Sequence, residues 1–289
     1  MGQQYHIVRK LKEKHEEQKP SLLPKKLLVG SIFMTTDDLM CRWLDLQLRY
    51  LHATTDNFKH VSFVTDCSSN AYFSERTTII PGPLGADIES YSHARGLTVL
   101  LHYFRTQRQN YKYFLFLDMD AFPIRAGWLE VLENRMKNFE IAVPIRSENL
   151  ENRLHSSILF TKPNALEHLG FDVISVGADT MGNNENDVSI AKYQTDRRNQ
   201  VFPLMRSNRY NIHPLLFGIY YDLFYHNSCG TGRRFNMRSR NYWSHMTSAQ
   251  ADVMGPTEEL FADPNTFIEK LAGYQPELYA KVKNEYSII

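Results

Sequence analysis

Cysteine is scarce in this 289-residue chain, and the three cysteines that occur stand far apart. Cys41, Cys67 and Cys229 form no C-x-x-C pair. This spacing argues against a disulfide framework and against a structural zinc site, and it is typical of a protein in a reducing compartment.

Long hydrophobic runs and an excess of charge of one sign are also missing. No apolar stretch approaches the roughly 18 residues of a membrane span, and residues 1–20 contain no apolar signal-peptide core. Thirty-three basic and thirty-two acidic side chains give a net charge of +1, without the basic excess of a nucleic-acid binder. We therefore expect a soluble cytoplasmic protein that does not bind nucleic acid. Peripheral membrane contact by the basic run 9–14 is an alternative to a solvated helix face.

The chain does contain an alternation of strand-like and helix-like patterns, without repeats or low-complexity tracts. Strands are expected at 26–34, 60–66, 77–82, 111–120, 141–146, 156–163 and within 216–227; helices are expected at 37–55, 92–107, 126–140, near Asp187 and twice within 257–282. This order predicts an α/β fold with a Rossmann-like, mainly parallel sheet flanked by helices. In such sheets ligands bind beyond the carboxyl ends of the strands.

Two acids close the apolar run "YKYFLFLDMD", namely Asp118 and Asp120. A buried charge is costly unless it is paired, so acids at the end of a buried strand usually meet a cation. Carboxylate oxygens suit Mg²⁺ or Mn²⁺, which proteins hold with one or two carboxylates plus substrate phosphates. The structural alternative is that the acids cap the helix expected from about Ala126.

The run from 111 to 132, "YKYFLFLDMDAFPIRAGWLEVL", resembles the metal-binding core of GT-A fold glycosyltransferases. Residues 90–104 resemble the preceding helix of that family, and "HPLLFGIYYDLFYHNSCGTGRRF" is similar to its late histidine segment. The resemblance covers roughly residues 26 to 235 and identifies no subfamily. It implies a GT-A type fold in one domain, with an irregular C-terminal region. The expected parts are a charged leader (1–25), a nucleotide-sugar-binding subregion (26–124) and an acceptor-side subregion (125–289).

The resemblance implies a metal site built from distant parts of the chain. Asp118 would face the ribose or reach the metal through water, Asp120 would bind the metal directly, and His226 would be the third ligand. His245 is the substitute, and an ordinary polar strand end is the alternative for His226. Mn²⁺ accepts a histidine nitrogen beside carboxylates more readily than Mg²⁺, so Mn²⁺ is the expected cofactor and Mg²⁺ the second choice.

The resemblance also implies where the nucleotide would lie. The expected contacts are Gly30, Thr35, Thr36 and Asp66 to base and ribose, His93 and Arg95 to the diphosphate, and Arg233 and Arg234 from a loop over the phosphates. Carboxylates accept hydrogen bonds from base and ribose, and anions favour helix N-termini. A turn acid at position 66 and a solvated arginine pair at 233–234 are the alternatives.

The implied reaction is transfer of a hexosyl or pentosyl group from a nucleotide-sugar donor, UDP-sugar first and GDP-sugar second, to a hydroxyl of a glycan or glycoconjugate. An inverting enzyme needs a carboxylate as general base, and the expected candidates are Asp187, then Glu185, with Asp179 in the same polar stretch. Asp187 could instead cap a helix. If neither Asp187 nor Glu185 is the base, we expect retention of configuration.

A sugar nucleotidyltransferase and a non-catalytic glycan- or nucleotide-binding module are the alternatives to a glycosyltransferase. The nucleotidyltransferase would need a glycine-rich basic loop after the first strand, which "VGSIFMTTDD" lacks.

Overall fold

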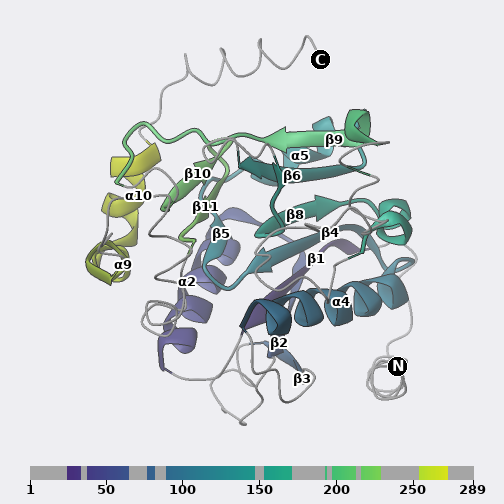
Figure 1. Cartoon of the computed structure of the whole chain (residues 1–289), viewed down its shortest axis with the longest axis horizontal. Helices are drawn as coiled ribbons and strands as arrows, with labels where there is room; N and C mark the ends of the chain where they lie inside the picture. The colour runs from purple at the N-terminus through teal and green to yellow at the C-terminus, as the bar shows by residue number, and fades with distance from the viewer. Residues whose placement is uncertain are drawn as a thin grey trace.

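The computed structural model describes residues 25–33, 38–64, 77–81, 89–146, 153–170, 193, 197–212, 216–228 and 254–272. Within these residues, the centre of the fold is an eight-stranded sheet (Figure 1). In spatial order its strands are β3 (Thr78–Pro81), β2 (Phe58–Val64), β1 (Lys25–Phe33), β4 (Tyr111–Asp118), β8 (Ile158–Thr161), β6 (Ile141–Arg146) and β7 (Arg153–Leu154), with β9 (Val201–Leu204) also paired to β6.

Most strands of this sheet point the same way. β1, β2, β3 and β4 are parallel neighbours, and β6 runs parallel to β9. β8 is antiparallel to both β4 and β6, and β7 is antiparallel to β6. Only β7 and β8 are therefore reversed among the described strands of the sheet, which confirms the predicted mainly parallel α/β fold.

Helices cover both faces because the central strands are apolar on both sides. Alternate side chains of β1 and β4, such as Leu28 and Phe114, pack with α4 (Glu89–Gln107) on one face. The intervening side chains, such as Val29 and Leu115, pack with Trp128 of α5 (Trp128–Arg135) on the other. The parallel half of the sheet is thus buried on both faces, which is what its unbroken apolar runs predict.

A second, three-stranded antiparallel sheet has the order β10-β11-β5. Its strands are β10 (Gly218–Tyr220), β11 (Phe224–His226) and β5 (Ala121–Pro123). It packs in one apolar cluster with α2 (Asp38–Thr54), α9 (Met254–Ala262) and α10 (Pro264–Ala272). Two short 3-10 helices, η1 (Pro163–His168) and η2 (Arg198–Gln200), complete the described elements. Among the described helices, none is both long and apolar enough to cross a bilayer.

One expected helix differs from the structure in its length. The helix expected at 126–140 is shorter, because Gly127 precedes it in the left-handed conformation (φ 82°) and Met136 is its C-cap. The strands expected within 216–227 are β10 and β11, which are separate because Tyr221 and Asp222 have positive φ angles (54° and 53°) and reverse the chain. The helix expected near Asp187 and the leader, apart from Lys25, lie outside the described residues.

Candidate metal centre

Asp118 and Asp120 lie at the carboxyl edge of the parallel half of the sheet. Asp118 is the last residue of β4, and Asp120 stands in the two-residue connection to β5. The chain winds outward from β1 through β2 to β3 and then returns to place β4 on the other side of β1. The two acids therefore stand beside a topological switch point, where α/β sheets bind ligands.

His226 reaches the same place through the small sheet. β11 pairs antiparallel with β5, and this register sets His226 opposite Ala121, the residue that follows Asp120. Beyond the strand, the backbone N–H of Asn227 donates to the carbonyl oxygen of Asp120 at 3.1 Å. Pairing of two segments that are distant in the sequence thus brings the histidine to the acids.

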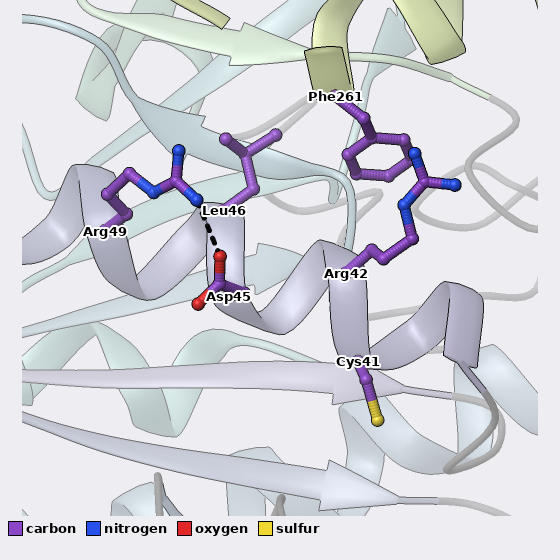
Figure 2. Close-up of a pocket in the computed structure, with 6 residues that line it drawn as sticks. All are labelled: Cys41, Arg42, Asp45, Leu46, Arg49 and Phe261. Atoms are coloured by element: carbon purple, nitrogen blue, oxygen red, sulfur yellow. Dashed lines mark hydrogen bonds and ion pairs between the residues drawn. The ribbon is translucent and has the colours of Figure 1, made fainter. Parts of the chain in front are cut away.

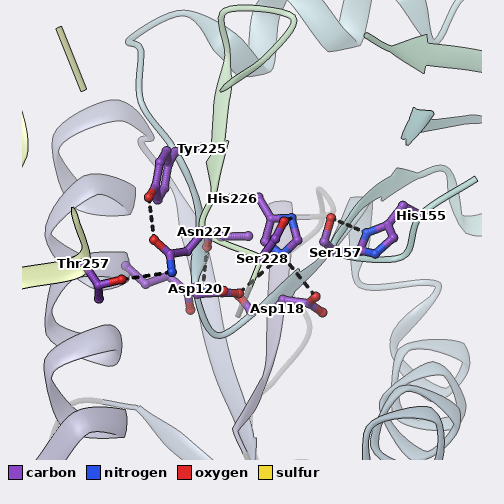
Figure 3. Close-up of polar contacts among 11 residues, drawn as sticks. Asp118, Asp120, His155, Ser157, Tyr225, His226, Asn227, Ser228 and Thr257 are labelled. Atoms are coloured by element: carbon purple, nitrogen blue, oxygen red, sulfur yellow. Dashed lines mark hydrogen bonds and ion pairs between the residues drawn. The ribbon is translucent and has the colours of Figure 1, made fainter. Parts of the chain in front are cut away.

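The three side chains converge closely enough to share one ion (Figure 3). The Nε2 atom of His226 lies 3.7 Å from Oδ2 of Asp118 and 3.5 Å from Oδ1 of Asp120. One ligand atom from each residue lies within 4.8 Å of the other two. Atoms held about 2.1 Å from a common ion lie roughly 3 to 4 Å apart, so the two distances from Nε2 of His226 to the carboxylates fit a single small cation.

Burial and hydrogen bonding restrain the imidazole. The side chain of His226 is 3% exposed, that of Asp120 is 5% exposed and that of Asp118 is 16% exposed. The Nδ1 atom of His226 shares a hydrogen bond of 3.0 Å with Oγ of Ser228, so Nε2 is the nitrogen that faces the carboxylates. A hydroxyl bonded to the far side of a histidine ring in this way orients the ring and its ligand nitrogen.

The capping interpretation of the two acids is wrong. Helix α5 begins after Gly127, and no side chain forms a hydrogen bond at that N-cap. Asp118 and Asp120 precede a strand of the small sheet instead, so their position is explained by the convergence with His226.

A second histidine lies beside the centre and was missed by the sequence reasoning. His155 is buried, shares a hydrogen bond of 2.8 Å with Oγ of Ser157, and has its ring centroid 5.5 Å from that of His226. The carbonyl oxygen of Ser157 accepts the backbone N–H of Asp118 at 2.9 Å. The sequence signal that could have indicated His155 is the polar run "HSS" directly before an apolar strand.

On the opposite side, Asn227 connects the centre to α9. Its side chain accepts a hydrogen bond of 2.6 Å from the hydroxyl of Tyr225 and donates one of 3.3 Å to Oγ1 of Thr257. Burial raises the pKa of the Tyr225 hydroxyl well above its ordinary value, and the nearby Asp120 carboxylate raises this pKa further. The phenol therefore stays protonated and donates.

Gly30, a predicted nucleotide contact, packs closely against α4 in the structure. Gly30 lies inside β1, and a Cβ there would meet Leu100 Cδ1 at 2.5 Å and Phe104 Cζ at 2.6 Å. Glycine is required because helix α4 approaches this point of the strand closely.

His93 and Arg95 lie in the first turns of α4, where the structure describes the backbone only. α4 leads directly into the amino end of β4, so its N-terminal turns lie toward the carboxyl edge of the sheet, as the diphosphate prediction requires. The other predicted site residues lie outside the described residues: Thr35, Thr36, Asp66, Asp179, Glu185, Asp187, Arg233, Arg234 and the substitute ligand His245.

A separate hollow of about 270 Å³ lies on the outer side of α2 (Figure 2). Its basic groups are already matched: Arg42 forms two hydrogen bonds to Glu258, at 2.9 and 2.7 Å, and Arg49 forms one to Asp45 at 2.8 Å. The Arg42 guanidinium also lies 4.0 Å from the centroid of the Phe261 ring. Because both arginines are already paired with carboxylates, we do not propose an anion site in this hollow.

Neither a protein-family model nor a curated protein sequence matches this chain. Similar solved structures include A197 from STIV, at 12% identity over 70% of this chain and 94% of that chain, with a TM-score of 0.38. They also include two structures of the glycosyltransferase GlyE from Streptococcus pneumoniae TIGR4. These show 13% and 12% identity over 63% and 62% of this chain, with TM-scores of 0.38 and 0.39. The match spans 45% of the GlyE chain. At this level of similarity the neighbours do not identify a function, so a functional assignment depends on the site.

Proposed function

We propose that this protein is a metal-dependent glycosyltransferase of GT-A type. It would move a sugar from a nucleoside-diphosphate donor, UDP-sugar first and GDP-sugar second, to a hydroxyl of a glycan or glycoconjugate. The observation that carries the proposal is the convergence of Asp118, Asp120 and His226 at the carboxyl edge of a mainly parallel sheet. This is the edge at which α/β folds bind nucleotides.

The donor set fits Mn²⁺, with Mg²⁺ as the second choice. Two carboxylates balance the charge of a divalent ion, and an imidazole nitrogen beside carboxylate oxygens is acceptable to Mn²⁺. Two or three protein ligands leave further coordination positions for phosphate oxygens. The hydroxyl of Ser228 can accept a hydrogen bond from a protonated Nδ1 of His226, so it is compatible with the tautomer that presents a bare Nε2.

When bound, the ion would stabilise the negative charge that develops on the departing diphosphate, an effect of several kcal/mol. The burial of the three side chains suggests which of them bind the ion directly. Asp120 and His226 are nearly inaccessible and suit direct binding, whereas the more exposed Asp118 suits contact with the ribose or a bridging water.

Activation of the acceptor hydroxyl is assigned from the sequence resemblance. Asp187 is the proposed general base, with Glu185 and then Asp179 as alternatives. The nucleotide contacts proposed for His93 and Arg95 agree with the direction of α4, because the N-terminal end of a helix attracts anions.

The proposal is tested by thermal shift with UDP, GDP, CDP and TDP, each with and without Mn²⁺. One nucleotide should raise the melting temperature only when Mn²⁺ is present. At a ligand concentration one hundred times Kd the gain is about 2.7 kcal/mol, or about 5 °C for a chain of this size.

Asp120→Ala should abolish this shift, whereas Asp56→Ala, which removes an exposed carboxylate between α2 and β2, should preserve it. An undiminished shift in Asp120→Ala would remove the proposed metal role. Release of sugar from the preferred nucleotide-sugar, measured with and without Mn²⁺, then separates an enzyme from a binding module. Binding without metal-dependent hydrolysis would favour the module.

A further inference from the structure

A buried polar side chain of α2 forms hydrogen bonds to the backbone of the turn that carries Asp118 and Asp120. Gln47 of α2 is fully buried, and its Nε2 atom donates to the carbonyl oxygen of Asp118 at 2.9 Å and to that of Ala121 at 2.7 Å. Both hydrogens of one amide are therefore used to join the two ends of the turn formed by residues 118–121.

The orientation of this amide is set by a chain of hydrogen bonds through the core. Its Oε1 atom accepts from Oγ of Ser31 at 2.5 Å, and the same Oγ lies 2.9 Å from Nε2 of His60. Since the proton of Ser31 goes to Gln47, His60 must donate from Nε2. Its Nδ1 then accepts from the hydroxyl of Thr77, 2.7 Å away. Burial lowers the pKa of His60 to about 3, so all the side chains in this series of hydrogen bonds are uncharged at neutral pH.

Glutamine is an unusual occupant of this position. The neighbouring inward-facing residues of α2, among them Trp43, Leu44, Leu48 and Leu51, are apolar and buried. An apolar residue at 47 would continue that stripe but would leave a buried carbonyl group, that of Ala121, and a partly buried one, that of Asp118, without these donors, which is costly. A fully satisfied polar chain in an apolar core selects one arrangement of its partners.

We propose that Gln47 is a positioning residue for the metal centre, an inference that rests on the proposed function. By joining the carbonyl groups on either side of Met119 and Asp120, it holds the turn so that both carboxylates stand within reach of one ion. The carbonyl of Asp120 is held separately by the backbone N–H of Asn227. Gln47 therefore acts on metal affinity without touching the metal.

The test is Mn²⁺ affinity of the intact chain, measured at 25 °C by loss of the EPR signal of the free aquo ion. Gln47→Met keeps the length of the side chain and removes both donors. Loss of a group that supports the metal ligands typically weakens metal binding about 10- to 100-fold, and we expect at least about a tenfold increase in Kd. Ser31→Ala removes the hydrogen bonds to Oε1 of Gln47 and to Nε2 of His60 but leaves both donors of Gln47 in place, so it is the milder second variant and should raise Kd by less.

Thr55→Val is the matched control for general destabilisation. It removes a buried hydroxyl that accepts from Nε1 of Trp128 at 2.8 Å, and none of its described hydrogen bonds involves the turn. Its melting temperature should fall while its Mn²⁺ affinity stays at the wild-type value. Equal Mn²⁺ affinity in wild type, Gln47→Met and Ser31→Ala would overturn the positioning role, and so would an equal loss in Thr55→Val. Failure of the wild-type protein to bind Mn²⁺ would instead overturn the proposed function.

Discussion

Replacing Gly30 with alanine tests how closely α4 packs on the sheet. A methyl group at this point of β1 would lie 2.5 Å and 2.8 Å from the two Cδ atoms of Leu100 and 2.6 Å from Cζ of Phe104. Ordinary contacts between carbon atoms are about 3.5 to 4.0 Å long, so the overlap is about 1 Å on both partners. Leu100 and Phe104 are fully buried, so neither can move into solvent.

The expected cost follows from two opposing effects. Overpacking a well-packed core costs about 1–3 kcal/mol, and two buried partners place Gly30→Ala near the upper end. Alanine recovers about 0.5–1 kcal/mol because it restricts the unfolded chain more than glycine does. We therefore expect a net loss of about 2 kcal/mol, which lowers the urea midpoint by about 0.7 M if the m value is about 3 kcal/mol/M.

Urea denaturation and nucleotide binding together decide the role of Gly30. The packing role predicts a lower midpoint with unchanged nucleotide affinity in the folded protein. Leu100→Ala removes two of the three clashing atoms. The loss of unfolding free energy in the double variant should therefore be about 1 kcal/mol smaller than the sum of the losses in the two single variants. An unchanged midpoint with weakened nucleotide binding would refute the packing role and favour the predicted nucleotide contact of Gly30.

Two further predictions concern backbone strain and a buried histidine. Gly127 has φ 82°, and a Cβ added to it would have nothing within 4 Å, so Gly127→Ala should cost about 1–2 kcal/mol from conformation alone, and Gly127→Asn should cost less in the same urea assay. Equal losses would contradict this. Burial lowers the pKa of His60 to about 3, so the unfolded chain takes up a proton below about pH 6.5 while the folded chain does not until about pH 3. Stability should therefore fall as the pH drops through that window, by about 2 kcal/mol between pH 7 and pH 5. His60→Gln should lack this part of the pH dependence, and identical pH profiles for the two proteins would contradict the assignment.

The central strands and the place of the acids were predictable because local patterns determine them. β1 and β4 are buried on both faces and therefore appear as unbroken apolar runs, and the acids stand at the end of such a run. Helix α2 was visible from the period of its apolar residues. The packing role of Gly30 was not predictable, because the close approach that it permits involves a helix distant in the sequence, α4.

The remaining parts of the site depend on pairings that local patterns do not encode. His226 came from the family resemblance, and it reaches the acids only because β11 pairs with β5. Gln47 carries a sequence signal, since it interrupts an apolar helix face, but its partners are backbone carbonyl groups 71 and 74 positions away. No side-chain pattern identifies such acceptors in advance.

Anomalous diffraction at the manganese edge, from crystals soaked with Mn²⁺ and UDP, tests the metal centre most directly. We expect one peak about 2.2 Å from an Asp120 carboxylate oxygen and from Nε2 of His226, with phosphate oxygens completing the coordination of the ion. A map without a peak at this edge of the sheet, or acids turned toward basic side chains instead, would contradict this expectation.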